Sequence, residues 1–348
     1  MKPQTRKALS DPRRMRSRAA QMARLRALFA GQRLEHAFVL SGVGPRSSDD
    51  GPDWEGWLDD GLDTLAAEAE AMMDPDVFRP LCLTYDPRGV HFIDRFFGAQ
   101  VFLLDGNWQA RTLDTPVGAL EAPDLHRHPS WQAVKRFTRA FLAREVPAVL
   151  LGMPTIASVL NIAVNLYGQR ILIAMMCEPE AARHDLRVIH DTLCSIHRWY
   201  LQHVPAAQRQ CIVPAGRCQP PGHGQLCGCT TQLLSPELYR DFIAPFDEAM
   251  LGLYPHGGMI HLCGRHTQHI PVWRRMKSLC AVQMNDRATC DLEAYFQGLR
   301  DDQILYVNPC PEMPVERILQ ITGGRRVVIV ADLKGPLTRA PAGPPDVV

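Results

Sequence analysis

Short apolar runs recur along the chain, separated by longer segments with the spacing of amphipathic helices. Eight runs of three to five residues are long enough for strands and too short for helices. They cover residues 37–40, 100–104, 148–151, 211–213, 258–262, 281–283, 304–307 and 326–330. We therefore predict about eight strands that alternate with helices.

Helix starts between these runs carry capping residues. The best example is Ser235, which is followed by Pro236 and Glu237. A serine side chain can accept a free backbone N–H, proline fits the first turn, and a carboxylate favours the positive end of the helix. Helices are predicted over residues 235–251, 291–299 and 314–321.

Regular alternation of strands and helices predicts a parallel sheet, because each helix carries the chain back for the next strand. About eight such units in 348 residues favour an α/β fold with a closed (β/α)8 TIM-type barrel. Catalytic groups in that fold lie at the carboxyl ends of the strands. Residues 43–125 are less regular and should add loops and helices over one end of the barrel.

The two ends of the chain differ from its middle. Ten Lys or Arg residues occupy the first 33 positions against one acid, Asp11, which predicts a basic N-terminal helix over residues 1–34. We expect a solvated first helix there, with an Arg-rich transit peptide as the alternative. Residues 35–335 are predicted to form a single barrel domain, and the Pro-rich residues 336–348 an extended or disordered tail.

Composition and charge exclude several classes of protein. The chain is 46% hydrophobic and 22% charged, as expected for a globular domain with a sizeable core. A formal net charge of +1 gives no overall field toward nucleic acid or a membrane surface. The longest uncharged run, residues 146–169, contains Pro147, Gly152 and Asn161, which suit a buried strand and helix better than a membrane span. We therefore expect a small-molecule substrate.

The cysteines indicate a reducing compartment. Eleven of them are scattered without a regular framework in a chain too large to need disulfides. We therefore expect reduced thiols in a cytoplasmic protein.

The strand end at residues 258–264 carries the clearest candidate chemistry. Side chains alternate between the faces of a strand, so His261 and Cys263 project to the same side. An imidazole and a thiolate two residues apart suit Zn²⁺. Gly264 ends the strand and allows close approach of the backbone. The alternative is that both side chains are ordinary core residues.

Three further thiols are candidates to complete this ligand shell. Cys227 and Cys229 lie in a Gly-rich loop one βα unit before His261, and neighbouring strand ends in a barrel are close enough to share a metal. Cys310 also follows a strand and is the rival third thiol. Loop thiols without any role are the alternative.

Two polar residues follow later strands. Asp286 and Asn308 should project near the same mouth of the barrel, where they would orient the substrate or the ligands of a metal. Either residue could instead cap the next helix. We predict His261, Cys263, Asp286 and Asn308 as the catalytic group.

The segments LLSPELYRDFIAP at residues 233–245 and GMIHLCG at residues 258–264 resemble the uroporphyrinogen decarboxylase superfamily, and its methylcobamide:thiol methyltransferase-type branch most of all. The resemblance extends over residues 145–330 and implies a (β/α)8 barrel. In that branch zinc activates a thiol to accept a methyl group from a corrinoid, which carries over to His261 and Cys263. It also implies a corrinoid protein as partner and a monomer or homodimer.

The chain departs from this pattern in two places. The branch has a late cysteine ligand, but residues 327–334 contain no cysteine, so one or both of Cys227 and Cys229 would have to substitute for it. The arginine motif of the decarboxylases is also missing, so decarboxylation of uroporphyrinogen or a related polycarboxylate is the alternative function and not the leading one. The missing late cysteine supports a second alternative, a non-catalytic binding or regulatory protein.

Overall fold

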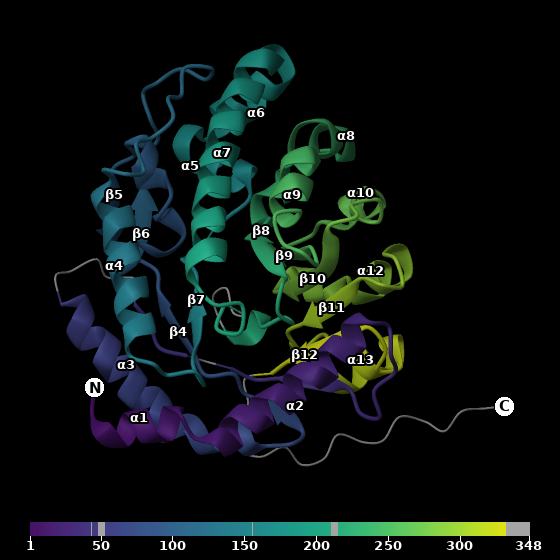
Figure 1. The fold of residues 1–348 in the computed structure, drawn as a ribbon. Coiled ribbons are helices and arrows are strands. Elements are labelled where there is room, and N and C mark those ends of the chain that lie inside the picture. Colours follow the sequence, from purple (N-terminus) through teal and green to yellow (C-terminus); the bar gives the residue numbers. More distant parts are fainter. Residues whose placement is uncertain (43, 48–52, 155, 210–214, 332–348) are drawn as a thin grey trace.

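The computed structural model describes residues 1–42, 44–47, 53–154, 156–209 and 215–331 as an α/β fold with a mostly parallel central sheet (Figure 1). Seven strands form the larger sheet in the order β3 (Val77–Phe78), β1 (Phe38–Leu40), β12 (Val327–Val330), β11 (Ile304–Val307), β10 (Leu279–Asn285), β9 (Gly258–Cys263) and β8 (Gly224–Cys227). All neighbours in this sheet run parallel, as the alternation of strands and helices predicted.

A second parallel sheet contains β2 (Arg46–Ser47), β4 (Cys82–Tyr85) and β7 (Leu150–Gly152) in that order. Strands β1 and β2 are successive parts of one segment, so the two sheets meet there. At the other end, Ala157 forms a single parallel bridge to Cys227 of β8. The sheets therefore approach each other at both ends, but within the described residues they do not form the closed ladder that a complete barrel requires.

One predicted strand does not take the expected place in the parallel sheet. Residues 100–104 contribute β5 (Val101–Leu104), which pairs antiparallel with β6 (Asn107–Ala110) in a separate hairpin. Asp105 and Gly106 both have positive φ, at 49° and 76°, as a two-residue hairpin turn requires. The predicted strand 211–213 lies outside the described residues. Strand β8 was missed because only its last two residues, Leu226 and Cys227, are apolar.

Thirteen α-helices in the described ranges surround the strands (Figure 1). They are α1 (Pro3–Leu9), α2 (Pro12–Phe29), α3 (Trp54–Glu68), α4 (Pro129–Ala143), α5 (Val159–Tyr167), α6 (Gln169–Cys177), α7 (Pro179–His203), α8 (Pro236–Leu238), α9 (Ala244–Leu251), α10 (Ile270–Trp273), α11 (Arg287–Cys290), α12 (Leu292–Gly298) and α13 (Val315–Thr322). Ser235 caps α8 by accepting the Leu238 N–H at 3.3 Å, as predicted. The chain then passes through a π-helical turn, Tyr239–Ile243, into α9.

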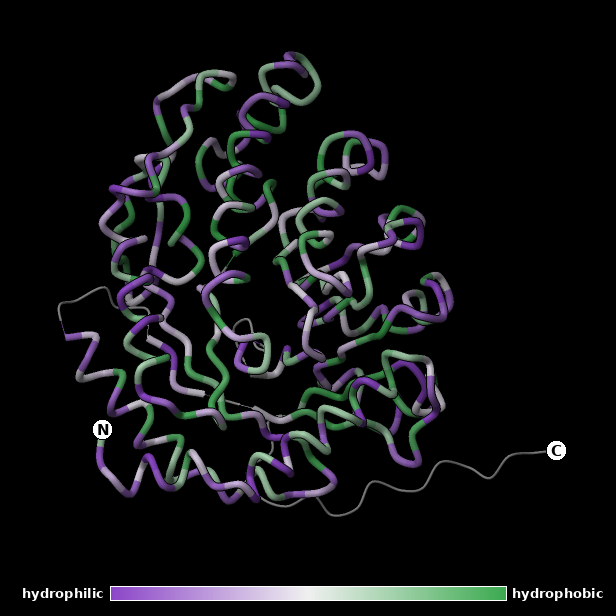
Figure 2. Tube along the Cα trace, viewed as in Figure 1, coloured by the Kyte–Doolittle hydropathy of each residue, from purple (hydrophilic) through white to green (hydrophobic). Residues whose placement is uncertain are grey.

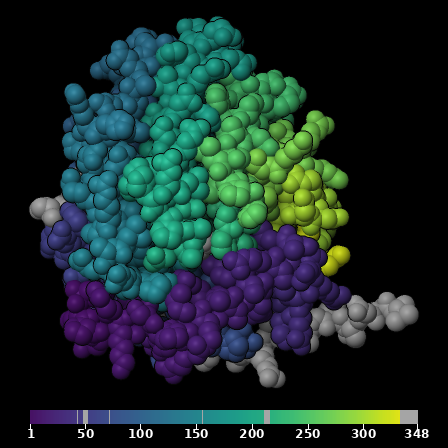
Figure 3. All heavy atoms as spheres, viewed as in Figure 1, coloured from purple at the N-terminus to yellow at the C-terminus, as the bar shows by residue number. Residues whose placement is uncertain are grey.

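The basic N-terminal segment is packed rather than fully solvated. Met22, Leu25 and Leu28 of α2 are buried against the larger sheet, and the space-filling view shows this segment lying along one side of the molecule (Figure 3). Arg14 is also buried, and its guanidinium donates to the Glu70 carboxylate at 3.0 Å. The high arginine content of this segment led to the prediction of a solvated helix and masked its apolar stripe.

Apolar residues gather along the strands and on the inward sides of the helices (Figure 2). The uncharged run 146–169 forms β7 and the buried helix α5, as predicted. No single helix among the described residues has both the length and the apolar composition needed to cross a membrane.

Helix α9 carries a buried carboxyl. Asp247 is fully buried, and its Oδ2 accepts the Tyr239 hydroxyl at 3.0 Å, while the Trp273 indole donates to that hydroxyl at 2.9 Å. Its Oδ1 has no hydrogen-bond partner in the described part of the chain. Burial raises the pKa of Asp247 from 3.8 to about 8, so the carboxyl is mainly neutral at neutral pH.

This carboxyl should make stability fall as pH rises. The neutral form is favoured in the folded state, so its contribution is complete below pH 4 and is lost as pH rises to about 8. Asp247→Asn should reduce this pH-dependent loss in the free energy of unfolding, which is on the order of a few kcal/mol. Urea denaturation across this pH range measures the effect. The exposed Asp241→Asn is the control, and equal pH slopes for Asp247→Asn and the unsubstituted chain would contradict the prediction.

Candidate metal centre

The central residue of the site is His261 on β9. It is 4% exposed, lies opposite Cys227 of β8 on one side, and lies opposite Gln283 of β10 on the other. Cys263 is two residues further along the same strand, and its Sγ lies 3.1 Å from His261 Nε2. Strand alternation therefore brings both side chains to the same side, as expected.

Gly264 is required at the end of this strand. Its φ is 94°, in the region that favours glycine, and a Cβ at this position would lie 2.4 Å from Gln232 Oε1. A larger residue would therefore strain the backbone next to Cys263 through its positive φ, whereas the Gln232 side chain could move aside.

Hydrogen bonds orient the imidazole. His261 Nδ1 donates to Gln283 Oε1, and Gln283 Nε2 donates in turn to Asn308 Oδ1. Because Nδ1 carries the proton, Nε2 keeps its lone pair for the thiol of Cys263 or for a metal ion. Asn308, predicted near this site, reaches it through Gln283.

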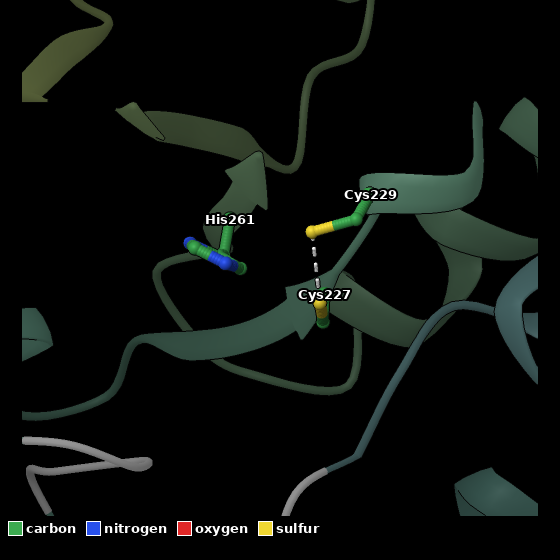
Figure 4. A group of neighbouring side chains, drawn as sticks. All are labelled: Cys227, Cys229 and His261. Carbon is green, nitrogen blue, oxygen red and sulfur yellow. Dashed lines mark hydrogen bonds between the residues drawn. The ribbon is translucent and has the colours of Figure 1, made fainter. Parts of the chain in front are cut away.

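Cys227 and Cys229 lie beside the imidazole (Figure 4). Cys227 is the last residue of β8, and Cys229 begins a 3₁₀ helix, Cys229–Leu233. Their Sγ atoms are 3.4 Å apart, and both lie within 4.8 Å of a ring nitrogen of His261. Cys227 therefore belongs to a strand rather than to the predicted loop, and its register opposite His261 brings the thiols into the site.

The thiols share protons unequally. A hydrogen bond from the Cys229 thiol lowers the pKa of Cys263 and that of Cys227, against the opposing effect of burial. The positive charge of Arg217 acts in the same direction on both. The pKa of Cys229 is raised, because its proton bridges the other two sulfurs. The three thiols therefore titrate as one coupled group.

An amide from α5 supports the sulfur cluster. Asn161 Nδ2 donates to Cys227 Sγ at 3.8 Å, and Asn161 Oδ1 accepts the Thr230 N–H at 3.1 Å. One turn later, Asn165 donates to the buried carboxylate of Asp94 at 2.9 Å. The sequence predicted only a buried helix here, although two asparagines four residues apart in an apolar helix were a usable signal for this role.

Two other candidates lie elsewhere. Asp286 is exposed, and it precedes α11 with a φ of 48°. In the described ranges no hydrogen bond joins its side chain to the cluster around His261. Cys310 groups with Cys290 and Glu312 instead of with His261. Gln283 was missed as a supporting residue, and its signal was a polar side chain within an otherwise apolar strand.

The donor set fits zinc. Three sulfurs and one imidazole nitrogen make a Cys₃His set, and a tetrahedron with Zn–S bonds of about 2.3 Å places its sulfurs about 3.8 Å apart. Donor atoms of Cys227, Cys229 and His261 all lie within 4.8 Å of one another, and the two sulfurs of this trio are 3.4 Å apart. Cys263 Sγ lies 3.1 Å from His261 Nε2 but is not part of that mutually close trio, so it would have to shift to become the fourth ligand. Ionised thiols and a free Nε2 are the protonation states that zinc binding needs.

Comparisons with known proteins support the fold. No family model matches the sequence, and no curated protein matches it significantly. Among solved structures, a methyltransferase from Methanosarcina mazei has a TM-score of 0.60 over 89% of this chain and 92% of its own, with 12% sequence identity. At that identity the likeness shows a common fold, and the resemblance to one branch of a superfamily is carried by the motifs alone.

Proposed function

We propose that this chain is a zinc-dependent methyltransferase that moves a methyl group between a corrinoid or small methyl donor and a thiol. The observation that carries the proposal is the cluster of Cys227, Cys229 and His261, whose donor atoms all lie within 4.8 Å of one another, with Cys263 Sγ 3.1 Å from His261 Nε2. The fold it shares with a methyltransferase supports the reaction class. We also infer that the two sheets correspond to a (β/α)8 barrel with irregular additions.

Zinc bound by these residues would lower the pKa of a substrate thiol, so that a thiolate exists at neutral pH. The thiolate sulfur would attack the methyl carbon, and the electron pair of the broken bond would stay with the donor. Cys263 and Cys227 supply negative sulfurs, while Gln283 fixes the orientation of His261. Asn161 holds Cys227 in place.

A catalytic zinc needs one position for the substrate. Four protein donors lie around this position, so a substrate thiol would have to replace one of them when it binds.

The direct test uses the full chain purified without chelators. We expect stoichiometric zinc and transfer of the methyl group of methylcobalamin to one member of a panel of small thiols, with the thioether detected by mass spectrometry. Consumption of uroporphyrinogen without methyl transfer would instead support the decarboxylase. Binding of these ligands without any turnover would support a non-catalytic protein.

A further inference from the structure

A second group of metal-binding side chains lies apart from the Cys₃His set. Cys290 ends α11 after β10, and Cys310 and Glu312 follow β11. One donor atom from each of these residues lies within 4.8 Å of the others. We propose that Cys290, Cys310 and Glu312 bind a second thiophilic divalent cation such as zinc, at the rim of the same strand ends.

Local hydrogen bonds hold the ligands of this peripheral site in place. Cys310 and Met313 exchange backbone hydrogen bonds of 3.2 and 3.0 Å, which fixes the turn that carries Glu312. The Thr289 hydroxyl, next to Cys290, lies 3.2 Å from the Met284 carbonyl and 3.1 Å from the Asn308 carbonyl. The two loops are therefore tied together before an ion binds, which reduces the entropic cost of binding.

The charge around the group favours a cation. The negative charges of Glu312 and Asp291 lie near Cys290. Arg265 offsets the charge of Asp291 only from a distance of 3.8 Å. Two thiolates and a carboxylate would add further negative charge, which a divalent ion neutralises. Sulfur ligands select zinc over magnesium or calcium.

This site should differ from the Cys₃His site in its affinity for the metal ion and in the rate at which the ion exchanges. Cys290 and Glu312 are exposed and Cys310 is half-buried, whereas His261 is buried. Three protein ligands leave a position for water. The peripheral ion should therefore bind more weakly and exchange faster. It should also stiffen Asn308, which supports His261 through Gln283.

Cobalt(II) titration of the metal-free full chain tests the proposal, because thiolate ligands produce a charge-transfer band. The Cys290→Ser/Cys310→Ser variant should bind one equivalent of cobalt(II) fewer than the unsubstituted chain. Its titration should lack the weaker of the two binding phases. Cys177→Ser, which removes an exposed thiol from α6, is the matched control and should leave the titration unchanged. Equal binding by the double variant and the unsubstituted chain would overturn the proposal.

A second measurement does not depend on substitutions of cysteine. Zinc should slow the alkylation of Cys290 and Cys310 by iodoacetamide, as measured by peptide mass spectrometry, and Glu312→Gln should weaken this protection. Alkylation at the same rate with and without zinc would overturn the proposal. Because the readout is specific to these two thiols, it is independent of whether the Cys₃His site binds metal or the chain transfers methyl groups.

Discussion

Cys263→Ser is expected to remove one equivalent of tightly bound zinc and to lower methyl transfer by at least about a thousandfold, equivalent to roughly 4 kcal/mol. Serine keeps the size of the side chain but is far too weak an acid to supply an anionic ligand at neutral pH. A hydrogen bond from Cys229 lowers the pKa of Cys263, and Cys263 Sγ lies 3.1 Å from His261 Nε2. Metal analysis and the methylcobalamin assay measure the two effects.

The control for this substitution is Cys280→Ser on the neighbouring strand. The Cys280 thiol donates to the His256 carbonyl at 3.0 Å, and serine can make the same hydrogen bond. This variant should keep its zinc and its activity. If Cys263→Ser retains the full zinc content of the unsubstituted chain, the metal centre is wrongly assigned. If the Cys263→Ser variant loses zinc but transfers methyl groups normally, the metal is not needed for methyl transfer.

Gln283→Met is expected to weaken zinc binding by about 10- to 100-fold while the chain remains folded. Methionine fills a similar volume but cannot accept the proton of His261 Nδ1. The imidazole would then lose the hydrogen bond that keeps Nε2 free for a metal. Competition with a chromophoric chelator gives the zinc affinity, and thermal denaturation of the metal-free chain reports folding.

A buried glutamine elsewhere separates this effect from general destabilisation. Gln303 is fully buried, and its amide donates to the Trp273 and Leu279 carbonyls at 3.0 and 2.9 Å. Gln303→Met should lower stability and leave zinc affinity unchanged. Gln283→Glu should restore affinity, since a carboxylate also accepts from Nδ1. Unchanged affinity in Gln283→Met would show that this hydrogen bond does not support the site.

The predictable parts of the fold were those encoded locally. The apolar runs of β9 to β12 and the cap at Ser235 depend on residues within a few positions of one another. The run at residues 100–104 was predicted as a barrel strand because its apolar pattern is typical of one. Leu103 and Leu104 are more than half exposed in the hairpin, so packing rather than pattern determined its place.

The site was only partly predictable for the same reason. Alternation along β9 placed His261 and Cys263 on one side. The choice between Cys310 and the Cys227–Cys229 pair stayed open, because sequence spacing does not show which strand end lies beside β9. Gln283 contacts His261 from 22 positions away along the chain, so no local pattern could connect them.

By itself the sequence determined the alternation of strands and helices, the absence of a strong net charge, and the face of β9 that carries the imidazole and the thiol. Only the tertiary structure decided that β8 lies beside β9 with Cys227 opposite His261, and that Cys310 joins Cys290 instead. The physical reason is that side-chain direction follows from local backbone geometry. Strand neighbours and register depend on the packing of the whole core.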